Sequence, residues 1–505
     1  ARSICCTEAP TARDRNRLVK EKSAVLKQPL FWVGILYFSQ GFPLGLFYDV
    51  FPVHFRQQGV DLREIGFLSL LGLAWTIKFL WAPAIDHYRH HRRWMFGVDL
   101  AMGAVLVYLS MQHGFGAPVW IAIALFTLLS ATNDIAIDGY TVELIGKNKL
   151  GLANGVRIAL YRVGMLAAGV ILILSDVLGW GGAYLVAAGL LVLLGAVCLA
   201  APKEMVLNVR KPLTLLRELR NIFFHPRAFG VVMLFFLGTL WLVNNATHWS
   251  RTVPNFWWLV FAVAGMLLTI SIVRDSHAAR VKDTRAEKLT QGPMFGALME
   301  MLQRPTILPV IGFVLIYKLG DASMGFMVKP FWVDSGFTPT QIGLVSVNIG
   351  ILLSILGGIA GGWFTDRVGI FHALWILGLA QAVSNLGYVW VASVIPLAAA
   401  GRPLEASHQV LMYAASATES FTGGLGSAAF LAFLMAIVNK QHSATEYALL
   451  SSIFALSRHV AGYASGFGAH YMGYAPYFLL TFFLAFPAYF LLPWVKKMLG
   501  DTGQR

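Results

Sequence analysis

Long apolar runs separated by short polar stretches dominate the chain from residue 31 onward. A helix needs roughly 20 mostly apolar residues to cross a bilayer core. By this rule the sequence holds about 14 membrane-spanning segments. They are predicted at 31–53, 65–84, 94–111, 118–141, 151–176, 182–201, 228–248, 254–273, 306–333, 341–364, 371–393, 409–437, 444–469 and 473–496. The pattern therefore predicts an all-α membrane protein.

The composition also favours a membrane protein over a soluble one. Of the 505 residues, 57% are hydrophobic and only 13% are charged, which leaves too little polar surface to cover a soluble core of this size. The net charge is +14, but the Lys and Arg residues gather in short loops between apolar runs. That placement indicates membrane orientation and not a nucleic-acid surface. The three cysteines do not make a disulfide framework.

The basic loops predict the orientation of the chain. "DHYRHHRRW" and "GKNK" follow alternate spans, whereas the intervening loops "QHGFGAPV" and "SDVLGWGG" contain no Lys or Arg. Loops rich in Lys and Arg stay on the cytoplasmic side of a membrane. We therefore expect the basic loops and both termini to face the cytoplasm.

Short matches in the same order relate the two halves of the chain. "DLREIGFLSL" from residue 61 resembles "TPTQIGLVSV" from residue 338, "ATND" resembles "ATES", and "ALYRVG" resembles "ALSRHV". Two parallel six-helix repeats with a long connection predict the major facilitator fold. The predicted segments are a basic cytoplasmic tail 1–30, a bundle 31–201, a linker 202–227, an inserted helix pair 228–273, a linker 274–305, a bundle 306–496 and a tail 497–505.

An acidic turn ends the second span of each repeat. "GGWFTDRVG" contains Asp366 and Arg367 and resembles the major facilitator signature G-x-x-x-D-R-x-G, while "APAIDHYRHHRR" contains Asp86 and departs from it at Pro83. Such a turn can pair with a neighbouring helix end and hold one conformation of the two halves. We interpret these three charged residues as structural or gating.

Charged residues inside the spans of the first half are the most informative feature of the sequence. A carboxylate in a bilayer is costly, by roughly 2.5–3.5 kcal/mol on insertion scales, yet Asp134 and Asp138 lie one turn apart in the fourth span. The helix rise places Asp134 at the depth of Arg162 in the fifth span, and Asp138 at the depth of Arg157. We therefore expect two ion pairs, Asp134 with Arg162 and Asp138 with Arg157. Lys78 lies nearer the cytoplasmic end and is expected to reach the interface.

The second half carries a similar set of charges. Glu419 lies in its fourth span, Arg458 in its fifth, and Lys318 and Asp321 lie in "YKLGDASMG" at mid-depth. Charges inside a membrane commonly mark a substrate or proton path, and transporter sites lie between repeats near the midplane. The alternative is that these residues are structural ion pairs between helices.

Several of these segments resemble the AmpG-type muropeptide permease family. They are "KFLWAPAIDHY", "NDIAIDGYTVEL", "ALYRVGMLAAG", "YKLGDASMG", "QAVSNLGYVW" and the Gly-rich segment from residue 421. The resemblance runs from about residue 30 to residue 492. It implies proton-coupled import of anhydro-muropeptides across a bacterial inner membrane for peptidoglycan recycling, which in many bacteria feeds β-lactamase induction. A related permease for a siderophore or acetyl-CoA is the alternative.

The candidate site residues fit an anionic cargo. Arg162, Lys318 and Arg458 could bind carboxylates. Asn348, Asn385 and Tyr317 could bind hydroxyls or amides. A carboxyl paired tightly with a cation stays ionised, so we expect Glu419 to carry the coupling proton and Asp134 to be structural, with Asp138 and Asp321 as further ion-pair candidates.

A membrane-embedded acyltransferase is the competing function class. His408 and His442 are the nearest candidates for its catalytic base, and neither lies in a recognisable constellation. We therefore expect a transporter and not an enzyme. The expected partners are a small-molecule substrate, protons and lipid, with no nucleic acid, no cofactor and no metal, and the chain is expected to act as a monomer.

Overall fold

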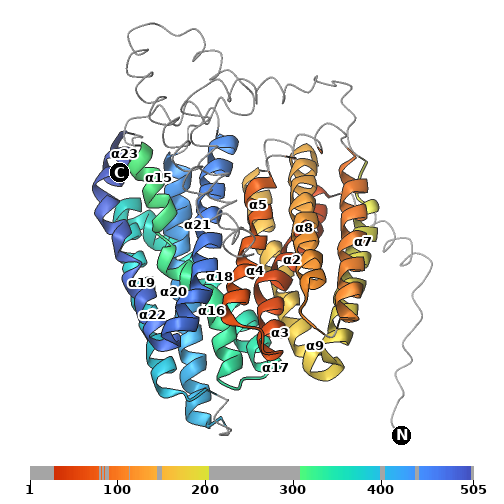
Figure 1. The fold of residues 1–505 in the computed structure, drawn as a ribbon. Coiled ribbons are helices and arrows are strands. Elements are labelled where there is room, and N and C mark those ends of the chain that lie inside the picture. Colours follow the sequence, from red (N-terminus) through yellow and green to blue (C-terminus); the bar gives the residue numbers. More distant parts are fainter. Residues whose placement is uncertain are drawn as a thin grey trace, which may run out of the picture.

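The computed structural model describes residues 28–78, 81, 85, 90–112, 114–144, 150–203, 307–397, 404–437 and 443–501. The predicted inserted pair 228–273, most of both linkers and nearly all of the tail 1–30 lie outside these residues. The described part is helical and folds into two bundles that stand side by side (Figure 1).

The first bundle contains six helical rods. They are α2 with α3 (Pro29–Gly45 and Phe51–Gln57), α4 with α5 (Leu62–Leu71 and Leu73–Ile77), α7 (His91–Ser110), α8 (Ala117–Leu144) and the two parts of α9 (Leu150–Leu199), which bends at Gly179. The bend has a positive φ of 72°, which glycine adopts without the cost that a side chain would add. The predicted spans of this half are confirmed to within about a turn at most ends, and the second of them is described only as far as Lys78.

The second bundle also contains six rods. They are α15 with α16 (Ile307–Ile316 and Leu319–Asp334), α17 with α18 (Pro339–Gln341 and Gly350–Val368), α19 (Ile370–Val394), α20 (Ala406–Ile437), α21 (Ser443–Met472) and α22 with α23 (Tyr474–Phe483 and Leu492–Asp501). Among the described residues, eight helical stretches are long and apolar enough to cross a membrane. The prediction of an all-α membrane protein is confirmed.

Two rods contain a π-helical segment, η1 (Leu46–Val50) and η4 (Ile342–Ile349). The first joins α2 to α3, and the second joins α17 to α18. A π-helical turn in an α-helix frequently lies at a functional site. Both segments face the boundary between the bundles, since η4 packs against α9 and η1 carries side chains that contact the second bundle.

The two ends of the molecule differ in their loops. Tight turns at Gly59, Gly179, Gly336 and Gly473, each with positive φ, connect rods at one end, which we call the turn face. The opposite end we call the basic face, because five cations lie at helix ends there: Arg92, Arg93, Arg367, Lys496 and Lys497. At the turn face, Arg56 and Arg63 are each paired with an aspartate. Both described ends of the chain, the start of α2 and the end of α23, lie on the basic face.

The two bundles meet closely at the turn face. A Cβ on Gly66 would lie 2.9 Å from Cα of Gly466, and a Cβ on Gly343 would lie 2.5 Å from the carbonyl oxygen of Gly169. The hydroxyl of Ser69 donates to the carbonyl oxygen of His459, and Arg56 forms a two-pronged ion pair with Asp334. Figure 1 shows the rods converging at this face, the lower end of the view, and diverging toward the basic face.

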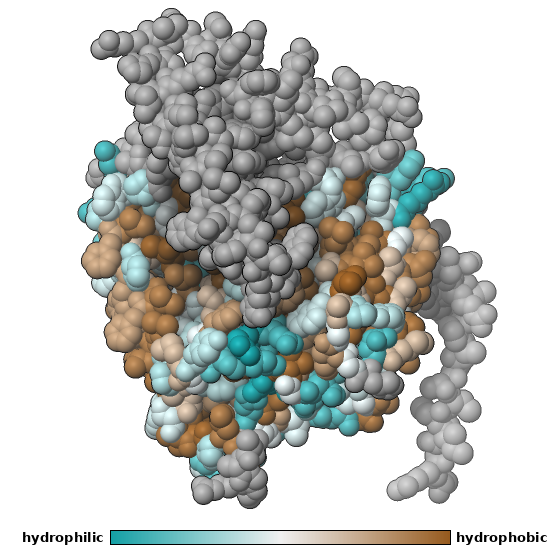
Figure 2. Space-filling view, viewed as in Figure 1, coloured by the Kyte–Doolittle hydropathy of each residue, from teal (hydrophilic) through white to brown (hydrophobic). Residues whose placement is uncertain are grey.

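Apolar side chains cover the outer flanks of both bundles. Val177, Ile359, Trp390, Val410 and Phe490 are each more than 60% exposed. Figure 2 shows hydrophobic residues on both flanks and a hydrophilic strip low in the centre, in front of the junction between the bundles. An apolar surface of this extent is suited to lipid and not to water.

Candidate functional site

A cluster of four charged residues occupies the first bundle. Lys78, directly after α5, has its Nζ 3.4 Å from Asp134 and 3.9 Å from Asp138 of α8. Arg157 of α9 lies 3.2 Å from Asp138, so this predicted ion pair is confirmed. The Tyr37 hydroxyl also donates to Asp138 at 2.7 Å. Two cations and two carboxylates therefore neutralise one another, which removes much of the cost of placing them in a membrane.

The predicted pair of Asp134 with Arg162 is wrong. Asp134 pairs with Lys78, and Arg162 donates from its guanidinium to the hydroxyl of Ser354 on α18, at 3.0 Å. The helix rise fixes the depth of a side chain but not the direction in which it points, and Arg162 points out of its own bundle. The expectation that Lys78 only reaches the membrane interface is also wrong, because its ammonium turns inward to the two carboxylates.

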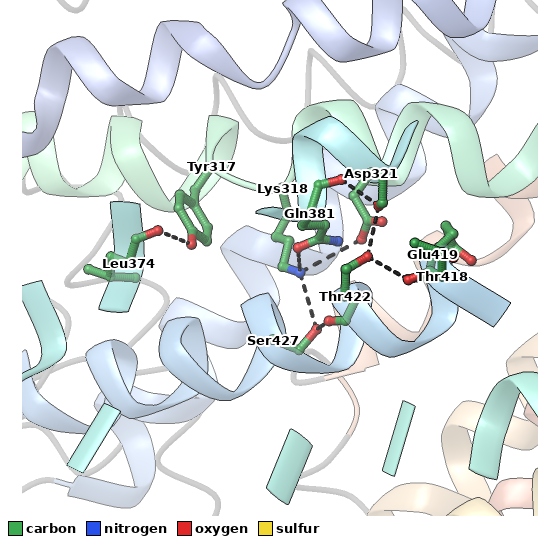
Figure 3. A network of polar contacts seen from close by, with 11 residues as sticks. Tyr317, Lys318, Asp321, Leu374, Gln381, Thr418, Glu419, Thr422 and Ser427 are labelled. Carbon is green, nitrogen blue, oxygen red and sulfur yellow. Dashed lines mark hydrogen bonds and ion pairs between the residues drawn. The ribbon is translucent and has the colours of Figure 1, made fainter. Parts of the chain in front are cut away.

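The second bundle has its own polar cluster around Lys318. This lysine lies at the break between α15 and α16, and its side chain is only 4% exposed. Its Nζ donates to Gln381 of α19 and to Ser427 of α20 at 3.2 Å, and Asp321 lies 3.8 Å away. Figure 3 shows these groups converging on the ammonium from three helices. Every described polar contact of Lys318 lies within its own bundle, so in this conformation its charge is used internally.

Glu419 lies in the same layer but has a different environment. It is on α20, two turns before Ser427, and its carboxylate contacts the neighbouring Ser420 hydroxyl at 3.4 Å. The described residues provide no ion pair for it, although Lys318, Lys329 and Asp321 act on it electrostatically. In Figure 3 its side chain lies apart from the Lys318 contacts. Glu419 therefore differs from Asp134, which a lysine neutralises directly.

The three predicted hydroxyl-binding or amide-binding residues are placed differently from one another. Tyr317 donates its hydroxyl to the carbonyl oxygen of Leu374 and stacks on Phe430, which is a packing role. Asn385 lines a small pocket beside Lys318, and its Oδ1 is buried without a hydrogen bond. Oδ1 of Asn348 is also buried and unbonded, and it presses against Gly169 of the first bundle. Tyr317 and Asn385 thus both line this pocket, whereas Asn348 lies at the contact between the bundles.

Arginines at corresponding positions of the two repeats reach across the boundary between the bundles. Arg162 of α9 contacts Ser354, as described above, and the guanidinium of Arg458 of α21 lies 4.4 Å from the ring centre of Tyr48 in η1. The Arg458 side chain is solvent-exposed, although it lies in the middle of a long helix. Each bundle therefore presents one arginine toward the other at the central layer.

The sequence reasoning missed an ion pair at this boundary. Lys329 of α16 lies 3.3 Å from Asp49 of η1 and donates to Ser346 of η4 at 2.7 Å. Lys329 lies inside the predicted span 306–333, and Asp49 lies inside the predicted span 31–53. Applying the cost of intramembrane charge to every span would have identified them. Asp99 was missed in the same way; it is fully buried and accepts hydrogen bonds from Ser39 and Asn133.

The residues predicted to gate the molecule are only partly described. Asp86 lies outside the described residues. Arg367 stacks its guanidinium on Trp363 at 4.4 Å, and the described chain shows no bond between Asp366 and a neighbouring helix end. The gating role of this turn stays a prediction. At the opposite face, Asp334 also accepts a hydrogen bond from Tyr474, so the ion pair with Arg56 belongs to a larger contact that closes the turn face.

The sequence is similar to a known family model and to named bacterial transporters. Residues 7–168 match the family described as Major Facilitator Superfamily. The chain is 27% identical over 477 residues to the anhydromuropeptide permease of Escherichia coli K12, covering 93% of this chain and 80% of that protein. It is 24% identical over 480 residues to the putative transporter AmpG 4 of Rickettsia conorii, covering 92% and 96% of the two chains.

Solved structures of transporters share the fold. The POT family transporter PepTSo superimposes with a TM-score of 0.63 at 13% identity, covering 94% of this chain and 98% of that chain. The nucleoside transporter NupG gives a TM-score of 0.55 at 12% identity, covering 93% and 99%. At this identity the likeness concerns the fold alone. The predicted major facilitator fold and the resemblance to AmpG-type proteins are confirmed, and these similarities indicate a multi-pass membrane transporter and not an enzyme.

Proposed function

We propose that this transporter, a homologue of the AmpG-type permeases, imports anhydro-muropeptides across a bacterial inner membrane by proton symport. The observation that carries the proposal is the central layer between the bundles, where Arg162, Arg458 and Lys329 present cations from both repeats. An anhydro-muropeptide offers peptide carboxylates to such groups and sugar hydroxyls to the amides nearby. Similarity to named anhydromuropeptide permeases over nearly the whole chain favours this cargo over other anions.

The basic face is proposed to lie in the cytoplasm. Lys and Arg residues are retained on that side of a bacterial membrane. The turn face, where the bundles meet through Gly66, Gly466, Gly169 and Gly343, then faces the periplasm. With that orientation the contacts at the turn face close the periplasmic side, as expected in the state from which an importer releases its cargo into the cytoplasm.

Glu419 is proposed to carry the coupling proton. A carboxylate paired with a lysine is stabilised in its ionised form, which applies to Asp134 beside Lys78. Glu419 forms no ion pair with any described residue and lies in the layer where cargo would bind. Protonation there would couple proton entry to the rocking of the bundles. The Asp366 turn is proposed to hold one of the two conformations.

Uptake by the purified protein in liposomes tests the proposed cargo. Labelled anhydro-muropeptide is supplied outside, with an inward proton gradient, and unlabelled anhydro-muropeptide, acetyl-CoA or a ferric siderophore is added as competitor. We expect only the muropeptide to compete strongly, because the similarity to anhydromuropeptide permeases favours this cargo over the other two anions. Uptake that acetyl-CoA or the siderophore competes away equally well would contradict the assignment. In the cell, the same import would feed peptidoglycan recycling and β-lactamase induction.

A further inference from the structure

The ion pair between Lys329 and Asp49 joins the two bundles at a position deeper in the molecule than the turn face. Its atoms lie 3.3 Å apart, and the two side chains are only 12% and 13% exposed. Lys329 lies five residues before Asp334 on α16, which corresponds to about 7.5 Å along the helix axis. The pair is therefore deeper than the rim contact between Arg56 and Asp334, and closer to the central layer.

Both partners of Lys329 come from π-helical segments. Asp49 lies in η1, and Ser346 lies in η4. These are the π-helical segments found in the described chain, and each replaces a regular turn at the boundary between the bundles. The extra residue of a π turn redirects the side chains that follow it, which is one reason why such turns occur at functional sites. The geometry around the Lys329 ammonium is thus built by two local departures from regular helix.

Opening of the turn face must separate this pair. Asp49 belongs to the first bundle and Lys329 to the second, so the distance between them grows when the bundles rock apart. Ser346 belongs to the second bundle and can stay with the lysine. The ammonium would then keep one neutral partner, and the position that Asp49 leaves is free for another anion.

We propose that Lys329 binds a carboxylate of the cargo when the turn face is open, and that Asp49 occupies that carboxylate's position when the face is closed. This inference rests on the proposed function, since it requires a cargo that carries carboxylates. Lys329 then has an anionic partner in both conformations, the cargo when the turn face is open and Asp49 when it is closed. Cargo enters from the turn face after Lys329 and Asp49 have separated. Its departure toward the basic face then allows Asp49 to return to Lys329.

The test compares an acidic cargo with a neutral one. Uptake into liposomes is measured for labelled anhydro-muropeptide with free carboxylates and for the same compound with its carboxyls converted to amides. The wild-type protein is expected to show a KM at least roughly tenfold lower for the acid, the factor expected of one charge-assisted contact. The paired substitution Lys329→Gln with Asp49→Asn leaves no unpartnered charge at this position. It is expected to lower the acid preference by about tenfold, the contribution of one charge-assisted contact, while Arg162 and Arg458 retain the rest.

A matched control uses the Arg56–Asp334 ion pair, which also joins the two bundles. The variant Arg56→Gln with Asp334→Asn removes the rim contact. It should alter the transport rate while keeping the acid preference. Lys329→Arg keeps the positive charge and should also keep the acid preference. An acid preference equal to that of the wild-type protein in the Lys329→Gln and Asp49→Asn variant would overturn the inference alone. Failure of the wild-type protein to take up either compound would overturn the proposed function and this inference with it.

Discussion

Replacing Lys78 with methionine is expected to destabilise the first bundle strongly. The substitution keeps an unbranched side chain but leaves Asp134 without a cation and Asp138 with Arg157 alone. Removing one partner of a buried ion pair costs about 3–5 kcal/mol. Because Lys78 is 29% exposed and Asp134 is 11% exposed, we expect the lower end of that range, about 3 kcal/mol.

The assay is thermal unfolding of the purified protein in detergent, followed by tryptophan fluorescence. A loss of this size lowers the midpoint by about 6–12 °C if the first bundle unfolds as one unit of roughly 170 residues. The double variant Lys78→Met with Asp134→Asn removes both charges and should recover roughly half of the loss or more. The control is Arg93→Met, which removes an exposed cation of the basic face and should leave the midpoint unchanged. Additive losses from Lys78→Met and Asp134→Asn would refute the reasoning, because they would show that the two side chains do not stabilise each other.

Two further predictions concern the alternation between conformations. Asp366→Asn should slow transport while leaving cargo affinity nearly unchanged; a loss of binding with normal turnover of the bound cargo would show that the turn is not a latch. Gly66→Ala should open the turn face, because its Cβ would lie 2.8 Å from a backbone oxygen of Tyr463, and this should increase the labelling of a cysteine introduced by Ser69→Cys. Gly358→Ala, whose Cβ meets nothing within 4 Å, should leave the labelling unchanged, and equal labelling in both variants would contradict the contact.

The sequence predicted the rods well because the bilayer imposes one length and one hydrophobic pattern on each of them. The span predicted at 371–393 is α19, Ile370–Val394, and the span predicted at 409–437 is α20, Ala406–Ile437. The short repeat from residue 61 to residue 338 also predicted an equivalence that the structure uses, because Gly66 and Gly343 both lie at the closed turn face.

Side-chain partners were harder to predict. The pairing of Asp138 with Arg157 followed from depth, but depth alone wrongly assigned Arg162 to Asp134. Depth does not fix the direction of a side chain around its helix, and Arg162 points to Ser354 of the other bundle instead of to α8. The pair of Asp49 with Lys329 joins residues 280 positions apart, so only the packing of the two repeats could reveal it.

Gradient-driven accumulation of anhydro-muropeptide in liposomes, measured for the wild-type protein and for Glu419→Gln, tests the central claim most directly. The wild-type protein should concentrate the cargo when the proton gradient points inward and should also exchange cargo across the membrane without a gradient. Glu419→Gln should lose accumulation and keep exchange, because the substitution removes the protonatable group and retains the shape of the side chain. Accumulation that persists in Glu419→Gln, or a wild-type protein that accumulates the cargo equally well without a proton gradient, would contradict the account.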